Sequence, residues 1–125
     1  IADLDQAINR RPDYSEAFDL RGISKHDVWR YADSLDDFDQ AIKLNPELAI
    51  AYNNRALSKA ALGNHTEAIG DYAAATKLDP ENESFYSRGL KESFPASDKA
   101  VISSGLAMKF IVSDRPSLRR GKLRL

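Results

Sequence analysis

The chain has 125 residues, of which 42% are apolar and 30% are charged, a balance that fits one soluble domain with its own core. It contains no cysteine, which excludes disulfides and thiolate metal sites and favours a cytoplasmic protein. No segment approaches the roughly 18 apolar residues that a membrane helix needs, so no membrane partner is expected. The net charge of −1 hides a division: residues 109–125 hold six basic residues and one acid (+5), which leaves −6 for residues 1–108.

Six helices are predicted from the pattern of apolar residues and from the stop signals between them. In chain order they cover residues 1–10, 14–28, 32–44, 48–62, 66–78 and 82–93. A proline follows the first, third and fifth of these helices. Proline ends a helix because it lacks the amide that the helix needs and clashes with the preceding turn. Gly63 supplies a left-handed stop after the fourth helix. Trp29 occupies the same place after the second helix, so we expect that turn to be built differently or its helix to run on.

A period of about 34 residues, a length typical of helical-repeat proteins, runs through these helices. Pro12, Pro46 and Pro80 follow one another at this constant interval, and so do the segments Asp3–Ile8, Asp37–Ile42 and Asp71–Thr76. An aromatic residue and an arginine follow each proline, and their second interval is one residue shorter than the first: Phe18 and Arg21, Tyr52 and Arg55, Phe85 and Arg88. Three independent marks that keep one period indicate a repeat protein.

The period and its residues resemble the tetratricopeptide repeat, whose signature is W-x2-L-G-x2-Y…A-x3-F…P. The second complete unit matches it at Tyr52, Ala56, Ala68, Tyr72 and Pro80, and the first at Phe18, Gly22, Ser34, Phe38 and Pro46. The sequence departs from the signature at Arg21 and Arg55 for leucine, at Lys25 and Lys59 for the second aromatic, and at Ser34 for alanine. The resemblance covers residues 1–94.

This resemblance implies an all-α, right-handed solenoid of antiparallel helix pairs. It divides the chain into a partial repeat 1–13, full repeats 14–47 and 48–81, and a half repeat 82–94. Because Ile1 falls within the second helix of a pair, we expect the chain to be the end of a longer array. Residues 95–125 leave the pattern, and we expect a capping helix over 98–112, with a strand as the alternative, followed by a basic tail. If this segment covers a second copy instead, the protein would self-associate.

Arginine and aspartate recur in step along the repeat, which indicates structural ion pairs in preference to a phosphate-binding stripe. Pairing within each unit would leave Asp3 and Arg88 alone. Pairing each aspartate with the arginine of the next unit uses all six residues, at nearly equal separations along the chain. We therefore expect the pairs Asp3–Arg21, Asp37–Arg55 and Asp71–Arg88.

No motif for catalysis, metal binding or phosphate binding is present. His26 and His65 are the only histidines, and neither stands in a metal-binding or triad pattern. Neighbouring acids fall on helix surfaces or helix starts, and glycine-rich phosphate loops are missing. We expect a protein that is not an enzyme and that needs no cofactor or metal.

The resemblance implies that the first helices of successive pairs line a concave groove, which receives a peptide or helix of a partner. The expected groove residues are Glu16, Asp19, Ile23, Ile50, Asn53, Asn54, Leu57, Tyr86 and Leu90. Asn54 matches an asparagine of the clamp that grips chaperone tails, but Asp19, Glu83 and Ser87 stand where that clamp needs cations. The acids and apolar groups favour a scaffold module for a protein segment that carries basic and apolar residues.

Three other readings remain open. One is that the chain is the regulatory arm of a larger enzyme, because its first repeat is partial. RNA binding, which a related helical-repeat family performs, is disfavoured because the period of that family is slightly longer and an acidic body repels phosphate. The turn around Trp29 is a second candidate surface for a partner, since interfaces are rich in tryptophan.

Overall fold

The computed structural model describes residues 1–93, which form only helices and turns. The helices are α1 (Ala2–Arg10), α2 (Ser15–Asp27), α3 (Tyr31–Leu44), α4 (Ala49–Ala61), α5 (His65–Leu78), the short 3-10 helix η1 (Pro80–Asn82) and α6 (Glu83–Ser93). Each end of the six α-helices lies within one residue of its predicted position. No helix in this part of the chain is long and apolar enough to cross a membrane. The predicted cap and basic tail, residues 95–125, lie outside the described residues.

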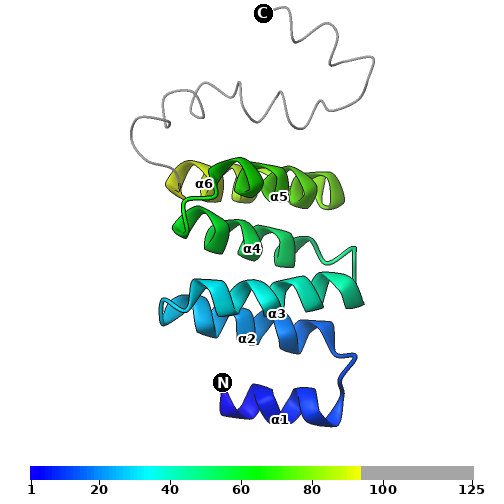
Figure 1. The fold of residues 1–125 in the computed structure, drawn as a ribbon. Helices are drawn as coiled ribbons and strands as arrows, with labels where there is room; N and C mark the ends of the chain where they lie inside the picture. The colour runs from blue at the N-terminus through cyan, green and yellow to red at the C-terminus, as the bar shows by residue number, and fades with distance from the viewer. Residues whose placement is uncertain (94–125) are drawn as a thin grey trace, which may run out of the picture.

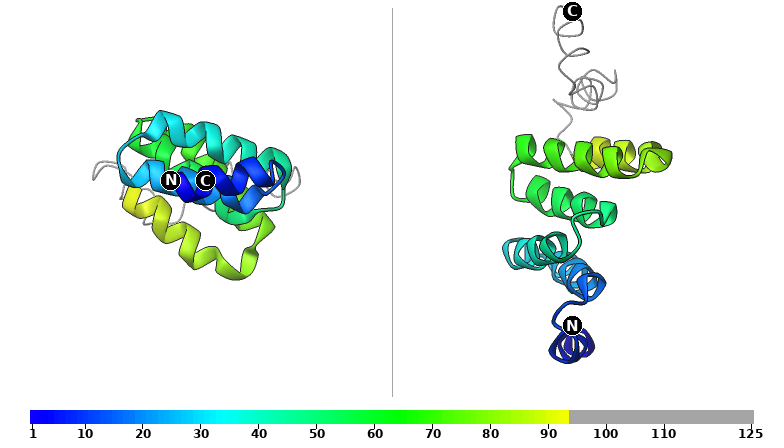
Figure 2. Two further views of the ribbon diagram at one scale, coloured as in Figure 1. Left: turned by 90° about the horizontal axis from the view of Figure 1, so that it is seen from below. Right: turned by 90° about the vertical axis from the view of Figure 1, so that its right-hand side faces the viewer.

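The helices stack in antiparallel pairs, which confirms the predicted solenoid (Figure 1). The most extensive contacts join α2 to α3 and α4 to α5, and α3 packs on α4 to link the two pairs. The first helices of the pairs also touch one another, α2 with α4 and α4 with α6. Figure 2 shows the stack from below and from its side, with α1 at one end and α5 and α6 at the other. The first helices therefore form one continuous row through the molecule.

Each second helix ends in the same way, because a proline follows two residues later. Arg11, Asn45 and Asp79 stand immediately before Pro12, Pro46 and Pro80, with φ between −137° and −141° and ψ between 70° and 89°. A residue before proline is driven out of the helical region by contact with the proline ring. The repeated proline thus sets the length of each second helix.

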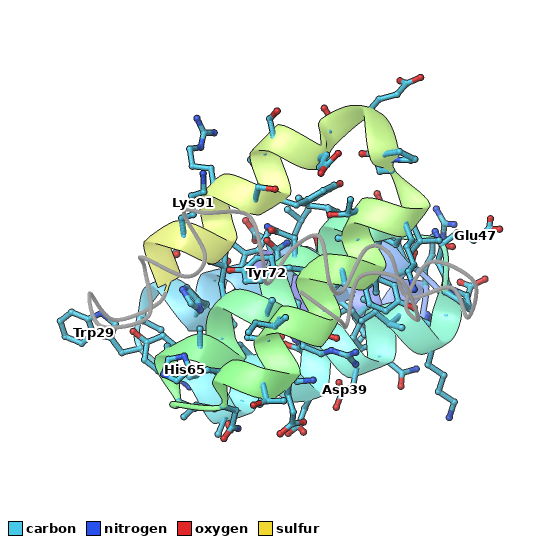
Figure 3. The ribbon with its side chains drawn as sticks, turned by 90° about the horizontal axis from the view of Figure 1, so that it is seen from above. Trp29, Asp39, Glu47, His65, Tyr72 and Lys91 are labelled. Carbon is cyan, nitrogen blue, oxygen red and sulfur yellow. The ribbon has the colours of Figure 1, made fainter. Side chains whose placement is uncertain are left out.

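Small residues opposite aromatic rings bring the paired helices close together. A Cβ atom added at Gly22 would lie 2.6 Å from the ring of Phe38, so only glycine fits there. In the next unit Ala56, Ala60 and Ala68 surround Tyr72, which is fully buried at the centre of the molecule (Figure 3). This alternation of small and large side chains is the packing that the repeat signature predicts.

The turn after α2 has the same geometry as the turn after α4, although a tryptophan replaces glycine. Trp29 has φ of 66° and Gly63 has φ of 88°. The amides of Trp29 and Arg30 bond to the carbonyls of His26 and Lys25 at 2.9 and 2.8 Å, and the turn at Gly63 repeats this pattern. The expectation of a different turn or a longer helix was wrong, because the bonds that end the helix outweigh the strain of a left-handed tryptophan.

Each of the first two repeat arginines is held between two aspartates, and we call this arrangement the Asp–Arg ladder. Nε and Nη2 of Arg21 donate to the two carboxylate oxygens of Asp37 at 3.0 and 2.7 Å, and Nη1 donates to Asp5 at 2.8 Å. Arg55 makes the same three bonds, at 2.9 and 2.8 Å to Asp71 and at 2.9 Å to Asp39. Each arginine therefore ties the second helix of its own unit to the second helix of the unit before.

The lysines that replace the signature aromatic join the ladder. Lys25 Nζ lies 3.0 Å from Asp37, and Lys59 Nζ lies 3.0 Å from Asp71. Burial alone would raise the pKa of Asp37, but the hydrogen bonds from Arg21 and Lys25 outweigh it and hold that pKa below its ordinary 3.8. The arginine and lysine departures from the repeat signature thus belong to one polar network in each unit.

The predicted pairing between units was wrong. Asp37 pairs with Arg21 and not with Arg55, and Asp71 pairs with Arg55. The contact between units is made by a second periodic acid, Asp5 or Asp39, which stands two residues later and so points in a different direction around the helix.

The last position of the ladder is incomplete within residues 1–93. Asp3 and Arg88 form no ion pair there, and Ala73 stands where the period would place an acid equivalent to Asp39. The Arg88 guanidinium lies 5.9 Å from the centre of the Phe85 ring. The ladder therefore holds together the units from α1 to α5.

A second polar chain, formed by His26, Ser58 and Ser34, joins the two complete units. The buried hydroxyls of Ser34 and Ser58 lie 2.7 Å apart, and Nδ1 of His26 lies 2.8 Å from Ser58 Oγ. Ser34 also donates to the carbonyl of Tyr31 at 2.6 Å. Burial lowers the pKa of His26 from its ordinary 6.5, although Asp27 raises it slightly. The histidine is therefore neutral in the folded protein at pH 7.

Removing one acid of the ladder should destabilise the fold. In Asp71→Ala, Arg55 and Lys59 lose their main partner while their side chains stay only 19% and 16% exposed. Because the pair is only partly buried, we expect a loss of about 2–4 kcal/mol, between the values for exposed and buried pairs. Urea unfolding followed by circular dichroism measures it. Asp3→Ala is the control and should cost less than about 0.5 kcal/mol; equal costs at the two positions would contradict the ladder.

Relieving the strained turn should stabilise the protein. A left-handed backbone costs a non-glycine residue roughly 1–2 kcal/mol. Glycine avoids this cost, but it also raises the entropy of the unfolded chain, which cancels part of the gain in stability. Trp29→Gly should therefore raise the free energy of unfolding by about 0.5–1 kcal/mol, since the indole is 80% exposed and packs little. Gly63→Ala should lower it by a similar amount. Thermal melts of both variants test the pair, and a less stable Trp29→Gly protein would show that the indole supports the fold.

Stability should fall as the pH is lowered through 6.5, the ordinary pKa of histidine. The folded-state pKa of His26 lies below the unfolded value of 6.5, so between the two the unfolded chain binds a proton that the folded chain does not. The expected slope of unfolding free energy against pH is positive in this window. His26→Asn should remove the slope there. An unchanged slope in His26→Asn would assign it to other groups.

Candidate functional site

A pocket of about 180 Å³ opens between α2 and α4, and we call it the α2–α4 pocket. It is lined by Ile23, His26 and Asp27 of α2, by Asn54 and Leu57 of α4, and by Phe38 of α3. The row of first helices thus contains a defined hollow at the junction of the two complete units.

Helix periodicity brings these side chains together. Ile23, His26 and Asp27 are three and four residues apart, and Asn54 and Leu57 are three apart, so each set lies on one face of its helix. The fully buried Phe38 ring reaches the pocket because Gly22 has no side chain to hold α3 away. The apolar part of the lining comes from three different helices.

A hydrogen bond between the first helices stands beside the pocket. Nδ2 of Asn54 donates to both carboxylate oxygens of Asp19, at 3.0 and 3.3 Å. Burial raises the pKa of Asp19, the bond from Asn54 lowers it, and the nearby Glu16 raises it; the net shift is upward. With 5% of its surface exposed, Asp19 holds α2 against α4 more than it faces a ligand.

The polar groups of the lining differ in charge and in exposure. His26 is neutral at pH 7 and its Nδ1 is bonded to Ser58, as described above. Asn54 is 8% exposed and its amide is committed to Asp19. Asp27 is exposed and forms no ion pair with the described residues, so it places one unneutralised carboxylate at the pocket.

The predicted groove residues fall into different environments. Ile23, Asn54 and Leu57 come together in the pocket, Glu16 is exposed on α2, and Ile50 is half-buried on α4. The Asn53 side chain is buried, and its Oδ1 has no hydrogen-bond partner within residues 1–93. Tyr86 is 3% exposed and its hydroxyl donates to Asp79 at 2.9 Å. The Leu90 side chain lies outside the described residues.

Three lining residues were not among the predicted groove residues: His26, Asp27 and Phe38. For His26 and Asp27 the signal was available, because they follow Ile23 by three and four residues on the same helix face. Phe38 belongs to a second helix, and only the approach permitted by Gly22 brings it to this surface. In the part of the chain that the structure describes, no group of three histidine or acidic side chains could hold a metal ion.

Comparison with known proteins identifies the architecture. Residues 49–82 match the family model of the tetratricopeptide repeat, and this span contains α4, α5 and η1. Among curated proteins, none matches this chain. The matched span is one helix pair with its closing proline, and the pair before it carries the same signature positions in the same stacked arrangement. Residues 49–82 therefore carry a tetratricopeptide repeat, a kind of repeat that suggests a protein–protein interaction module.

Proposed function

We propose that this module binds an extended or helical segment of a partner protein along the row formed by α2, α4 and α6, and that it acts as a scaffold without catalysing a reaction. The observation that carries the proposal is the α2–α4 pocket, a hollow whose apolar lining is Ile23, Leu57 and the buried Phe38. Pockets with apolar walls and a few polar groups are the usual sites of recognition.

The charges around this surface favour a basic partner. Glu16 and Asp27 are exposed on α2. The cations of the same helix, Arg21 and Lys25, are bound to Asp37 and so turn toward α3. The free charge on the partner side of α2 is therefore negative. A segment that carries lysine or arginine beside its apolar anchors complements it, and binding should weaken as salt is added.

The same charges argue against nucleic acid as the ligand. Residues 1–93 contain 17 acids and 11 basic residues, a net charge of −6. Of the three arginines that the repeat places in step, Arg21 and Arg55 are each shared between two carboxylates, and Arg88 is exposed on α6. A phosphate backbone would meet repulsion and few available cations.

Reversing the exposed acids should change which peptide is bound. The test uses two fluorescent peptides of equal length, one of lysine and leucine and one of glutamate and leucine, with anisotropy as the readout. The wild type should prefer the lysine peptide, and Glu16→Lys combined with Asp27→Lys should weaken that binding roughly tenfold, since rim charges contribute modestly. Asp19 is left unchanged because its substitution would break the contact with Asn54.

The matched control is Asp36→Lys with Glu47→Lys, which makes the same change of charge at exposed positions outside the row of first helices. This variant should bind the lysine peptide within about twofold of the wild type. A small loss is expected from the change in net charge alone, which acts on the peptide at long range. Equal binding of both peptides by the wild type, or equal losses in the two variants, would contradict the proposed surface.

A further inference from the structure

We infer that the α2–α4 pocket is the anchor of the binding surface: it takes one apolar side chain of the partner, of the size of leucine, methionine or phenylalanine, and Asp27 faces a basic residue next to that anchor. This inference rests on the proposed function and names the chemistry that gives it specificity. It concerns a single hollow, not the whole row of helices.

The volume of the pocket suits one such side chain. A cavity of about 150 Å³ lined by leucine, isoleucine and phenylalanine holds one benzene molecule. The α2–α4 pocket measures about 180 Å³, and Ile23, Leu57 and Phe38 supply the same kinds of wall. A phenyl ring or a branched aliphatic group would fill most of it, whereas an alanine methyl group would leave most of it empty.

Two polar atoms of the pocket lining already have hydrogen-bond partners within the protein. The Asn54 amide already donates to Asp19, and Nδ1 of His26 already lies 2.8 Å from Ser58 Oγ. A buried polar guest group would therefore lose water without gaining a partner at these two nitrogen atoms, which costs binding energy. An apolar side chain has no polar group to desolvate, and it gains contact with the partly exposed Ile23 and Leu57.

The carboxylate of Asp27 at the edge of the pocket is specific to the junction of α2 with α4. A shift by one repeat along the chain replaces His26 and Asp27 with Ala60 and Ala61. The corresponding place between α4 and α6 therefore has no carboxylate from the first of its two helices. A partner with one basic residue beside its anchor has a single best register on the row of first helices, and this is how a repetitive surface can fix the position of its ligand.

The experiment is a double-mutant cycle with the lysine and leucine peptide, in a version that has one leucine and alanine at the other apolar positions. Changing that leucine to alanine should weaken binding to the wild type by about tenfold or more. Ile23→Phe, which adds atoms at the pocket wall, should weaken binding of the leucine peptide by a similar factor and bind the alanine peptide no worse than the wild type does. Such coupling shows that the leucine and Ile23 share one space.

Leu78→Phe is the matched control, because it makes a similar enlargement on a second helix, α5, at a position that is 41% exposed and outside the pocket lining. It should leave both affinities within about twofold of the wild type, in keeping with the usual near-neutrality of such surface changes. Circular dichroism confirms that each variant is folded. Additive losses in the cycle would overturn the anchor while leaving peptide binding in place.

Toluene serves as a second probe that needs no peptide. Titrated into the wild type, it should shift the methyl signals of Ile23 and Leu57 in the NMR spectrum, and Ile23→Phe should abolish the shift of the Leu57 signals. Methyl signals that do not respond would overturn the pocket as an apolar site. Toluene binding without any peptide binding would instead overturn the proposed function, and the anchor with it, so the two failures are distinguishable.

Discussion

The guanidinium groups of Arg21 and Arg55 hold this solenoid together, because each binds carboxylates from two successive second helices at once. A planar group with five donors can face one carboxylate with two parallel bonds and still reach a second, which a lysine cannot do. This interaction fixes how far α2 lies from α3 and where α4 follows. The contact of Gly22 with Phe38 and the pocket beside it both depend on that spacing. The ladder thus supports the α2–α4 pocket as well as the stacking of the units.

Three separate sets of polar contacts join the two complete units. The ladder joins the second helices on one side, the bond from Asn54 to Asp19 joins the first helices, and the chain from His26 through Ser58 to Ser34 runs between them. In repeat proteins, stability is close to a sum of terms within units and between neighbours. Because the α2–α4 pocket lies on the boundary between units, a ligand there contacts both and adds to the term between them. If the proposed ligand binds there, binding and stacking should therefore be coupled.

The elements that follow from local rules could be predicted, and those that depend on contacts between units could not. The helix ends were correct because each proline and the residue before it restrict the backbone directly. The arginine pairing was wrong because only one acid per unit was considered, although Asp5 and Asp39 keep the same period. The pocket was predicted in part, through Ile23, Asn54 and Leu57, while the contribution of Phe38 required the distance between α2 and α3. The prediction for the turn at Trp29 was wrong because a tryptophan disfavours the left-handed backbone, whereas the hydrogen bonds that close the helix require it.

The position of Trp29 has a consequence for optical spectroscopy of this protein. It is the only tryptophan in the chain, and it projects from the edge of the stack (Figure 3), far from the buried Tyr72. Because its indole is surrounded mainly by water in the folded protein, its emission should already resemble that of an unfolded chain. Tryptophan fluorescence is then a poor measure of melting for this domain. The same property makes it a built-in label, since a blue shift in its emission would report any molecule that covers the turn between α2 and α3.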